Sequence, residues 1–242
     1  MQQQLQLGVR FFDVRARHYE NTFRIHHGGD YVGFTFAEVL NMIQTFYNTP
    51  GNSQETIIMS LKREHDDYNV SREFYQTLDE YLNNFSLTNR FYIGDDIPKL
   101  KDVRGKVVIM RRFKQAPNSN HGLNCHVFED NVNYSFDINK CRVQDYYHTD
   151  PNTKKNAIDA LMAKAVTQPN DNLLWINFFS GINVGMGLYA EWFSQRINPW
   201  ALERLPELSL VNKQIWKGVL AFDYINHDLV QLALIFNQRL IW

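Results

Sequence analysis

The sequence has few cysteines, no long apolar run and almost no net charge, and each shortage excludes a class of protein. Cys125 and Cys141 are the only cysteines, without Cys-x-x-Cys or His-rich spacing, so neither a disulfide framework nor a structural zinc site is supported, although one bridge between them stays open. No apolar stretch is long enough to span a bilayer, and the first ten residues lack the regions of a signal peptide. With 25 basic and 26 acidic residues, binding to long stretches of nucleic acid is not expected.

The chain has 242 residues, 44% of them hydrophobic, which is enough for one sizeable core, and a single domain over 1–242 is expected. Apolar runs of strand type alternate with amphipathic stretches of helix type. Strands are predicted at 8–17, 22–27, 55–63, 105–112, 140–147, 172–179 and 218–224, and helices at 35–50, 71–85, 153–166 and 227–240. A strand followed by a helix, repeated along the chain, predicts parallel pairing in an α/β sheet.

Nearly every predicted strand has an apolar body and a charged or polar end. These ends are Asp13 and Arg15, His27, Lys62 and Glu64, Arg112, Asp145, and Asp223. In a (β/α)8 barrel of the TIM type the carboxyl ends of all strands meet at one mouth, whereas a doubly wound sheet gathers such groups only near its switch point. The pattern favours the barrel. Because a closed barrel needs eight strands and seven are found, the missing one lies either near 90–94 or before residue 1.

Six segments, in this order, resemble the bacterial, metal-independent phosphatidylinositol-specific phospholipases C, and the resemblance runs from about residue 5 to the C-terminus. They are GVRFFDVRAR, FRIHHG, ETIIMSLKRE, DVRGKVVIMRRF, VQDYY and FDYIN. The family fold is an irregular TIM barrel, in agreement with the strand pattern. The resemblance implies that the inositol 2-hydroxyl attacks the phosphate and breaks the glycerol–phosphate bond, which yields diacylglycerol and inositol 1,2-cyclic phosphate.

The resemblance also implies a role for each of nine residues, because this chemistry needs a base, an acid and a cation beside the phosphate. His27 matches the general acid, Arg15 matches the cation that replaces calcium, and Asp13 matches an acidic neighbour. Asp223 matches the carboxylate that orients the general base. The inositol head group is expected to contact the other five, which are Lys62, Glu64, Arg112, Asp145 and Tyr147, the last by stacking. No metal and no cofactor are expected.

The general base of the family has no match in the sequence. That base is a His followed by Asp on the first barrel strand, and the Asp partners the general acid. His65 and His227 are each followed by Asp, but one follows the strand at 55–63 and the other opens the last helix. The unmatched base and the missing strand point to one absent segment, so we expect the sequence to begin late rather than to be a natural variant.

Structural roles are the alternatives for several of these residues. Asp13 and Arg15 would, by themselves, be an ion pair that caps a barrel. Lys62, Glu64 and Arg112 would form an ordinary salt-bridge cluster.

Alternation along a strand separates neighbouring residues of the same type. His26 points away from His27 and is expected to be a packed or surface residue. Arg111 likewise points away from Arg112 and is expected to be packed or to face solvent. The glycine-rich, aromatic stretch 180–193 is either a buried connection or a rim that dips into a lipid interface.

Two other functions remain open. A catalytically silent module that binds inositol phospholipids would explain the absent base, and a metal-dependent glycerophosphodiesterase shares the barrel and a His pair. The expected partners are phosphatidylinositol or a related inositol phospholipid and, transiently, a membrane surface. A monomer is expected, and secretion follows from the family although the sequence carries no signal peptide.

Overall fold

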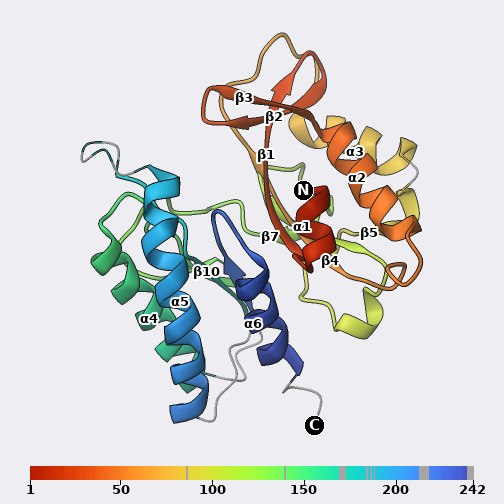
Figure 1. Cartoon of the computed structure of the whole chain (residues 1–242). Helices are drawn as coiled ribbons and strands as arrows, with labels where there is room; N and C mark the ends of the chain where they lie inside the picture. Colours follow the sequence, from red (N-terminus) through yellow and green to blue (C-terminus); the bar gives the residue numbers. More distant parts are fainter. Residues whose placement is uncertain are drawn as a thin grey trace. The chain divides into compact units, whose positions relative to one another are not determined.

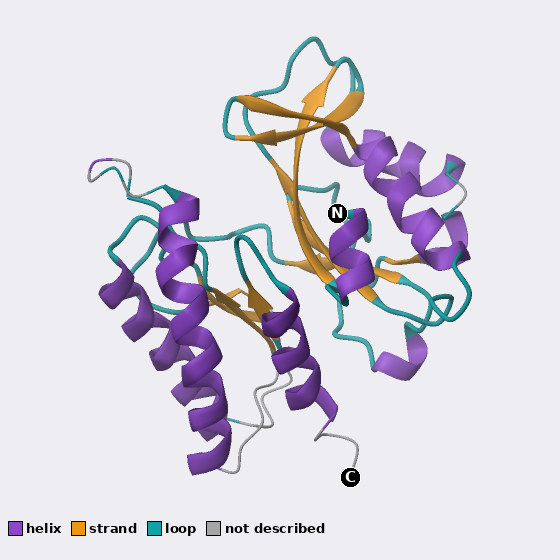
Figure 2. Ribbon diagram, viewed as in Figure 1, coloured by secondary structure: helices purple, strands orange, loops and turns teal. Residues whose placement is uncertain are grey.

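The computed structural model describes residues 1–85, 87–138, 140–168, 173–183, 185, 187, 189–212 and 218–238. It divides the chain into two compact units, Met1–Phe128 (unit 1) and Glu129–Trp242 (unit 2), which are described separately (Figure 1). In each unit the strands form a sheet flanked by helices (Figure 2). None of the described helices combines the length and apolar character needed to cross a membrane.

Unit 1 is built on a seven-stranded sheet in which β1, β4 and β6 lie side by side and parallel. The order of its strands is β3-β2-β1-β4-β6-β5, and β7 also pairs with β6. Its elements are α1 (Gln2–Leu7), β1 (Phe11–Tyr19), β2 (Thr22–His27), β3 (Asp30–Thr35), α2 (Phe36–Asn48), β4 (Ile57–Arg63), α3 (Phe74–Asn84), the 3-10 turns η1 (Thr88–Arg90) and η2 (Leu100–Asp102), β5 (Phe91–Tyr92), β6 (Val107–Arg112) and β7 (Leu123–Asn124).

Strand β1 shows how the sequence builds both the core and a polar face. Its even-numbered residues, Phe12, Val14, Ala16 and His18, are buried, whereas the odd-numbered ones stay partly exposed. This period of two is what a strand requires when one face packs on a core. Because the polar residues of β1 are all odd-numbered except His18, the charges of the opening segment lie on one face.

The predicted parallel arrangement is wrong for the strand at 22–27. It forms β2, which pairs antiparallel with β1, and β3 continues the meander. The cause is the two-residue turn between β1 and β2, in which Glu20 and Asn21 have φ values of 50° and 55°. Two residues with positive φ form the kind of turn that joins antiparallel strands, and no helix intervenes.

The helices of unit 1 follow from their caps and apolar faces. At the start of α2, the Thr35 hydroxyl accepts a hydrogen bond from the Glu38 backbone N–H, and the Glu38 carboxylate accepts one from the Thr35 N–H, so the two residues form a capping box. The face of α2 that carries Leu40 and Ile43 is fully buried in the same core as β4. The prediction of a helix at 35–50 is confirmed.

Unit 2 contains a four-stranded sheet in the order β11-β10-β9-β8, in which β9, β10 and β11 are parallel. Strand β8 is antiparallel to β9. The elements are β8 (Phe136–Ile138), β9 (Cys141–Gln144), α4 (Pro151–Thr167), β10 (Leu174–Phe178), α5 (Ala190–Asn212), β11 (Val219–Ala221) and α6 (His227–Gln238). Helix α5 packs against both α4 and α6.

Two further expectations can be placed on the structure. A short strand, β5, lies in the stretch 90–94 and pairs in parallel with β6, as one of the two alternatives for the missing strand predicted. In the stretch 180–193, helix α5 begins at Ala190 and Tyr189 is 59% exposed, while 184, 186 and 188 lie outside the described residues.

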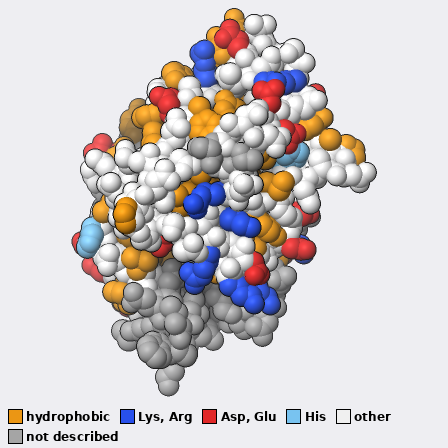
Figure 3. Space-filling model, turned by 90° about the vertical axis from the view of Figure 1, so that its right-hand side faces the viewer, with side chains coloured by type: hydrophobic (Ala, Val, Ile, Leu, Met, Phe, Trp, Pro, Cys, Tyr) orange, Lys and Arg blue, Asp and Glu red, His pale blue; other side chains and the backbone are white. Residues whose placement is uncertain are grey.

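Side chains of both charges lie among apolar ones on the face in Figure 3, as the near-zero net charge predicts.

Candidate active site

The sheet of unit 1 brings polar side chains from three parallel strands next to one another. Its register pairs Asp13 of β1 with Ser60 of β4, Arg15 with Lys62, and Lys62 with Arg112 of β6. Cα partners on adjacent strands carry side chains on the same face of the sheet. Four of the residues predicted at the ends of strands therefore meet on one face, and these are Asp13, Arg15, Lys62 and Arg112.

Asp13 is the centre of this group. Its Oδ2 accepts a hydrogen bond from Arg15 Nε at 2.9 Å, and its Oδ1 accepts hydrogen bonds from Ser60 Oγ at 2.8 Å and from Arg112 Nη1 at 3.0 Å. Burial alone raises the pKa of Asp13, but the guanidinium groups of Arg112 and Arg15 and the Ser60 hydroxyl hold that pKa below its ordinary value. Asp13 is therefore a carboxylate that orients two arginines.

Glu64 forms a second centre beside the first. Lys62 Nζ lies 2.6 Å from Glu64 Oε2, while Arg15 Nη1 lies 3.5 Å from Oε1. The backbone N–H of Gly28 donates to the same Oε1 at 2.9 Å. Burial raises the pKa of Glu64, and the contacts with Lys62, Gly28 and Arg15 more than offset that effect, so the pKa is lowered. Arg15 thus lies between two carboxylates that fix its guanidinium group.

The five charged side chains form one continuous chain of ion pairs with a net charge of +1. Arg15, Lys62 and Arg112 carry three positive charges against the two negative charges of Asp13 and Glu64. The ion pairs named as the structural alternative are therefore present. The excess positive charge is what a site for an anionic phosphodiester requires, because a partly desolvated anion needs cationic hydrogen-bond donors.

The two neighbouring histidines differ in their surroundings. His26 is 5% exposed and stacks at a tilt on Tyr31 with ring centroids 5.7 Å apart, as expected of a packed residue. Burial lowers the pKa of His26, with Arg17 adding to the effect. His27 is exposed at the end of β2. Because Gly28 is bound to Glu64, the backbone that carries His27 lies at the edge of the charged cluster.

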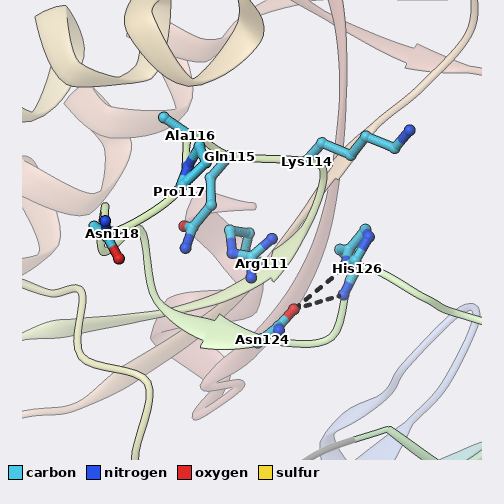
Figure 4. A pocket seen from close by; sticks show the side chains of 8 residues that line it. All are labelled: Arg111, Lys114, Gln115, Ala116, Pro117, Asn118, Asn124 and His126. Atoms are coloured by element: carbon cyan, nitrogen blue, oxygen red, sulfur yellow. Dashed lines mark hydrogen bonds between the residues drawn. The ribbon is translucent and has the colours of Figure 1, made fainter.

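Arg111 lies on the other face of β6 from Arg112, and it lines a separate hollow in unit 1. The Arg111 side chain is buried, and one guanidinium N–H donates to the Phe113 carbonyl at 2.5 Å. The hollow has a volume of about 330 Å³, and Asn124 Oδ1 contacts Nδ1 of His126 at its wall (Figure 4). Its lining consists of Arg111, Lys114, Gln115, Ala116, Pro117, Asn118, Asn124 and His126. Arg111 is therefore not part of the charged cluster around Asp13.

Unit 2 holds the other three predicted site residues, and two of them lie near a buried lysine. Asp145, directly after β9, is 4% exposed, and Asp223 follows β11 and is partly buried. Burial lowers the pKa of Lys154 in α4 to about 7, and the carboxylates of Asp145 and Asp223 both act in the opposite direction. The structure thus brings Asp145 and Asp223 to the same buried cation.

Tyr147, the predicted stacking residue, is anchored at both ends. Its hydroxyl donates to Asp130 Oδ2 at 3.0 Å, and its backbone carbonyl accepts from the Ile182 N–H at 2.7 Å. These contacts give the ring a defined place in unit 2.

Sequence reasoning missed Ser60 and Lys154. Ser60 is a small residue two positions before Lys62, so the alternation of β4 places it on the same face, and this signal could have identified it. Lys154 stands in a helix beside another lysine, and the sequence gives no indication of which one is buried. Among the described residues, no cluster of three or more His, Cys, Asp or Glu side chains is arranged to hold a metal ion.

Comparison with known proteins places the chain in a family. Residues 1–113 match the family described as phosphatidylinositol-specific phospholipase C, X domain. A 1-phosphatidylinositol phosphodiesterase of Staphylococcus aureus (strain Newman) is 30% identical over 236 residues, which cover 93% of this chain and 74% of the relative. The chain belongs to the bacterial phosphatidylinositol-specific phospholipase C family. Another relative, the 1-phosphatidylinositol phosphodiesterase of Listeria monocytogenes, is 28% identical over 92% of this chain and 66% of its own length.

Solved structures of the family agree with this assignment. A structure of the phosphatidylinositol-specific phospholipase C of S. aureus matches with a TM-score of 0.82 and 27% identity, over 97% of this chain and 82% of that one. The corresponding enzyme of L. monocytogenes matches with a TM-score of 0.77 and 24% identity, over 98% and 81% of the two chains. These matches confirm the predicted fold class, an α/β fold of the irregular TIM-barrel type.

Proposed function

We propose that this chain is a phosphatidylinositol diacylglycerol-lyase. The inositol 2-hydroxyl gives up its proton to a general base and attacks the phosphorus, the bond to the glycerol oxygen breaks as that oxygen takes up a proton, and the products are diacylglycerol and inositol 1,2-cyclic phosphate. The family membership supports this reaction. The single observation that carries the proposal is the chain of ion pairs from Arg112 through Asp13, Arg15 and Glu64 to Lys62, with one positive charge in excess.

In this mechanism Arg15 binds the phosphoryl oxygens. Asp13 and Glu64 hold its guanidinium from two sides, so that the group is oriented before the phosphate binds. Charge that develops on the phosphate in the transition state is stabilised by a cation that is already in place, without reorganisation. Metal-independent cleavage is therefore part of the proposal.

His27 supplies the proton for the departing glycerol oxygen. An exposed imidazole at the rim of the cluster can reach a leaving group that points toward the lipid, and histidine is suited to this step because its ordinary pKa lies near neutrality. Lys62, Glu64 and Arg112 hold inositol hydroxyls, and the resemblance assigns head-group contacts to Asp145 and Tyr147 as well. Asp223 takes the place of the carboxylate that orients the general base of the family, a base for which this sequence has no match.

A catalytically silent module that binds inositol phospholipids is the second candidate. The observation that favours it is the unmatched general base. His65, in the left-handed region with φ of 61°, follows β4, and His227 opens α6, so neither stands on a first barrel strand. Such a module would use the same head-group contacts without turnover.

The deciding experiment measures diacylglycerol release from phosphatidylinositol vesicles beside binding to the same vesicles. Release that persists with chelator supports the lyase, and binding without release supports the silent module. Release abolished by chelator would instead support the metal-dependent glycerophosphodiesterase. Arg15→Met should abolish release, and Arg17→Met is the matched control because Arg17 lies on the same strand and bonds the Asp66 carbonyl instead of the cluster.

The lipid substrate also implies where the protein acts. The relatives are bacterial phosphodiesterases of phosphatidylinositol, and one solved relative is described by its membrane binding. We propose that this chain acts outside the cell, at the surface of a membrane, as a monomer.

A further inference from the structure

Lys154 is a buried cation for which the proposed mechanism has no use. It lies in the first half of α4, its relative exposure is 0%, and it is among the largest fully buried side chains of the described residues. A lysine is almost never fully buried unless its ammonium is well compensated, because desolvation of the charge is unfavourable. The surroundings of Lys154 therefore have to explain its position.

The ammonium group holds the backbone that follows β9. Lys154 Nζ donates to the backbone carbonyl of Tyr146 at 2.9 Å and to Gln144 Oε1 at 3.1 Å. The same Oε1 accepts the N–H of Tyr146 at 2.8 Å. The N–H and the carbonyl of Tyr146 are thus both fixed, and Tyr146 lies between Asp145 and Tyr147. The path of segment 145–147 is set by these three bonds.

The Gln144 side chain is itself held by hydrogen bonds, so it fixes segment 145–147 rigidly. Its Nε2 donates to Asn177 Oδ1 at 2.7 Å and to the Phe178 carbonyl at 2.9 Å, and Asn177 Nδ2 donates to the Ile158 carbonyl at 3.1 Å. With two bonds donated and two accepted, the Gln144 amide has no alternative orientation that satisfies its partners. A fully satisfied buried network of this kind rigidifies the elements it joins, here β9, β10 and α4.

The charge of Lys154 acts on the carboxylates of the proposed site. Asp145 follows β9 and Asp223 follows β11, and both attract the Lys154 ammonium. Asp145 is 4% exposed, so its charge also requires compensation before a neutral inositol hydroxyl can bind to it.

We propose that Lys154 is a positioning residue for the inositol head group: its ammonium fixes segment 145–147 and balances the charges of Asp145 and Asp223, without touching the substrate. This inference rests on the proposed function, because Asp145 and Tyr147 are the head-group contacts. It goes beyond that function by assigning control of head-group affinity to a residue buried in a helix.

The first test compares Lys154→Met with Lys155→Met. The two lysines are adjacent in α4 and undergo the same change, but the Lys155 ammonium is partly exposed and lies 5.6 Å from the centre of the Trp200 ring. Binding of free myo-inositol and turnover on phosphatidylinositol vesicles are measured for wild type and both variants. Lys154→Met should weaken myo-inositol binding and raise KM roughly tenfold, the scale of one lost charged hydrogen bond, with a smaller change in kcat. Lys155→Met should match wild type.

The second test needs no Lys154 variant to fold. Because the pKa of Lys154 is lowered to about 7, the wild-type affinity for myo-inositol should fall as pH rises through 7 and the ammonium loses its proton. Asp145 and Asp223 are the carboxylates that act on Lys154. His148 follows the segment and is exposed, so the titration is repeated in His148→Gln. An affinity that stays constant from about pH 6 to 9 in both proteins would overturn the inference.

The outcomes distinguish a failure of the positioning role of Lys154 from a failure of the proposed function. If wild type binds myo-inositol and releases diacylglycerol while Lys154→Met behaves like Lys155→Met, the positioning role is wrong and the function stands. If wild type neither binds myo-inositol nor releases diacylglycerol, the proposed function fails and the positioning role fails with it.

Discussion

Replacing Asp13 by Asn removes one negative charge from a place where two guanidinium groups depend on it. The carboxylate accepts bonds from Arg15, Ser60 and Arg112, and the Arg112 side chain is only 4% exposed. An Asn amide keeps one acceptor oxygen and leaves the Arg112 charge without its partner. Removing one member of a buried ion pair destabilises a protein by about 3–5 kcal/mol.

The lower end of that range applies, because the Asp13 side chain is 19% exposed and water reaches it. We expect Asp13→Asn to lower the free energy of unfolding by about 3 kcal/mol, which for a chain of this length lowers Tm by roughly 6–12 °C. The assay is thermal and urea unfolding followed by circular dichroism. Asp30→Asn, at the exposed start of β3, is the matched control.

The loss of stability in Asp13→Asn should also depend on pH. The pKa of Asp13 in the folded protein is lowered below 3.8, so its stabilising contribution is complete well above pH 3.8 and is lost as pH falls through the folded-state pKa. The difference between wild type and Asp13→Asn should therefore shrink in acid. Equal stability of Asp13→Asn and Asp30→Asn at neutral pH would refute the account of Asp13 as the centre of the cluster.

Three further predictions concern other parts of the chain. Arg15→Lys keeps the charge but loses the two-pronged geometry, so turnover on phosphatidylinositol should fall steeply while the circular dichroism spectrum stays unchanged; turnover equal to wild type would contradict the role of Arg15. The pKa of Lys154 falls from 10.5 to about 7 on folding, so the unfolding free energy of wild type should rise with pH between these values, by up to about 5 kcal/mol relative to Lys154→Met, and parallel pH curves would contradict the burial of the charge. Thr35→Ala removes the hydroxyl half of the α2 capping box and should lower the free energy of unfolding by about 1 kcal/mol in urea titrations, with Thr45→Ala on the exposed side of the same helix as reference.

The parts of the fold that could be predicted from the sequence are those encoded locally. The strand predicted at 8–17 and the helix predicted at 35–50 depend on the pattern of residues within one element, and both predictions are confirmed. The direction of β2 depends on a turn formed by Glu20 and Asn21, which lacks the glycine that usually marks positive φ. Helix α5 was not predicted because Pro199 and Pro206 interrupt its sequence, yet the helix accommodates both.

The candidate site also contains some residues that could be predicted from the sequence and others that could not. The period of two within a strand is visible in the sequence and puts Asp13 and Arg15 on one face of β1, whereas Lys62 joins them through the register of β1 and β4. Lys154 could not be distinguished from Lys155, because adjacent lysines in an amphipathic helix look alike until the packing of α4 on β9 buries one of them. Polar residues inside a core are specified by tertiary contacts, and a single sequence does not record those.

The alternation of β1 also governs which changes in chain length the protein tolerates. Every second side chain of this strand is in the hydrophobic interior, and the ones between them are Asp13, Arg15 and Arg17. Inserting or deleting one residue inside β1 would turn the guanidinium groups inward and the apolar side chains outward, because a one-residue slip reverses both faces. Evolution can therefore alter this strand by substitution, but changes in its length would remove catalysis and folding together.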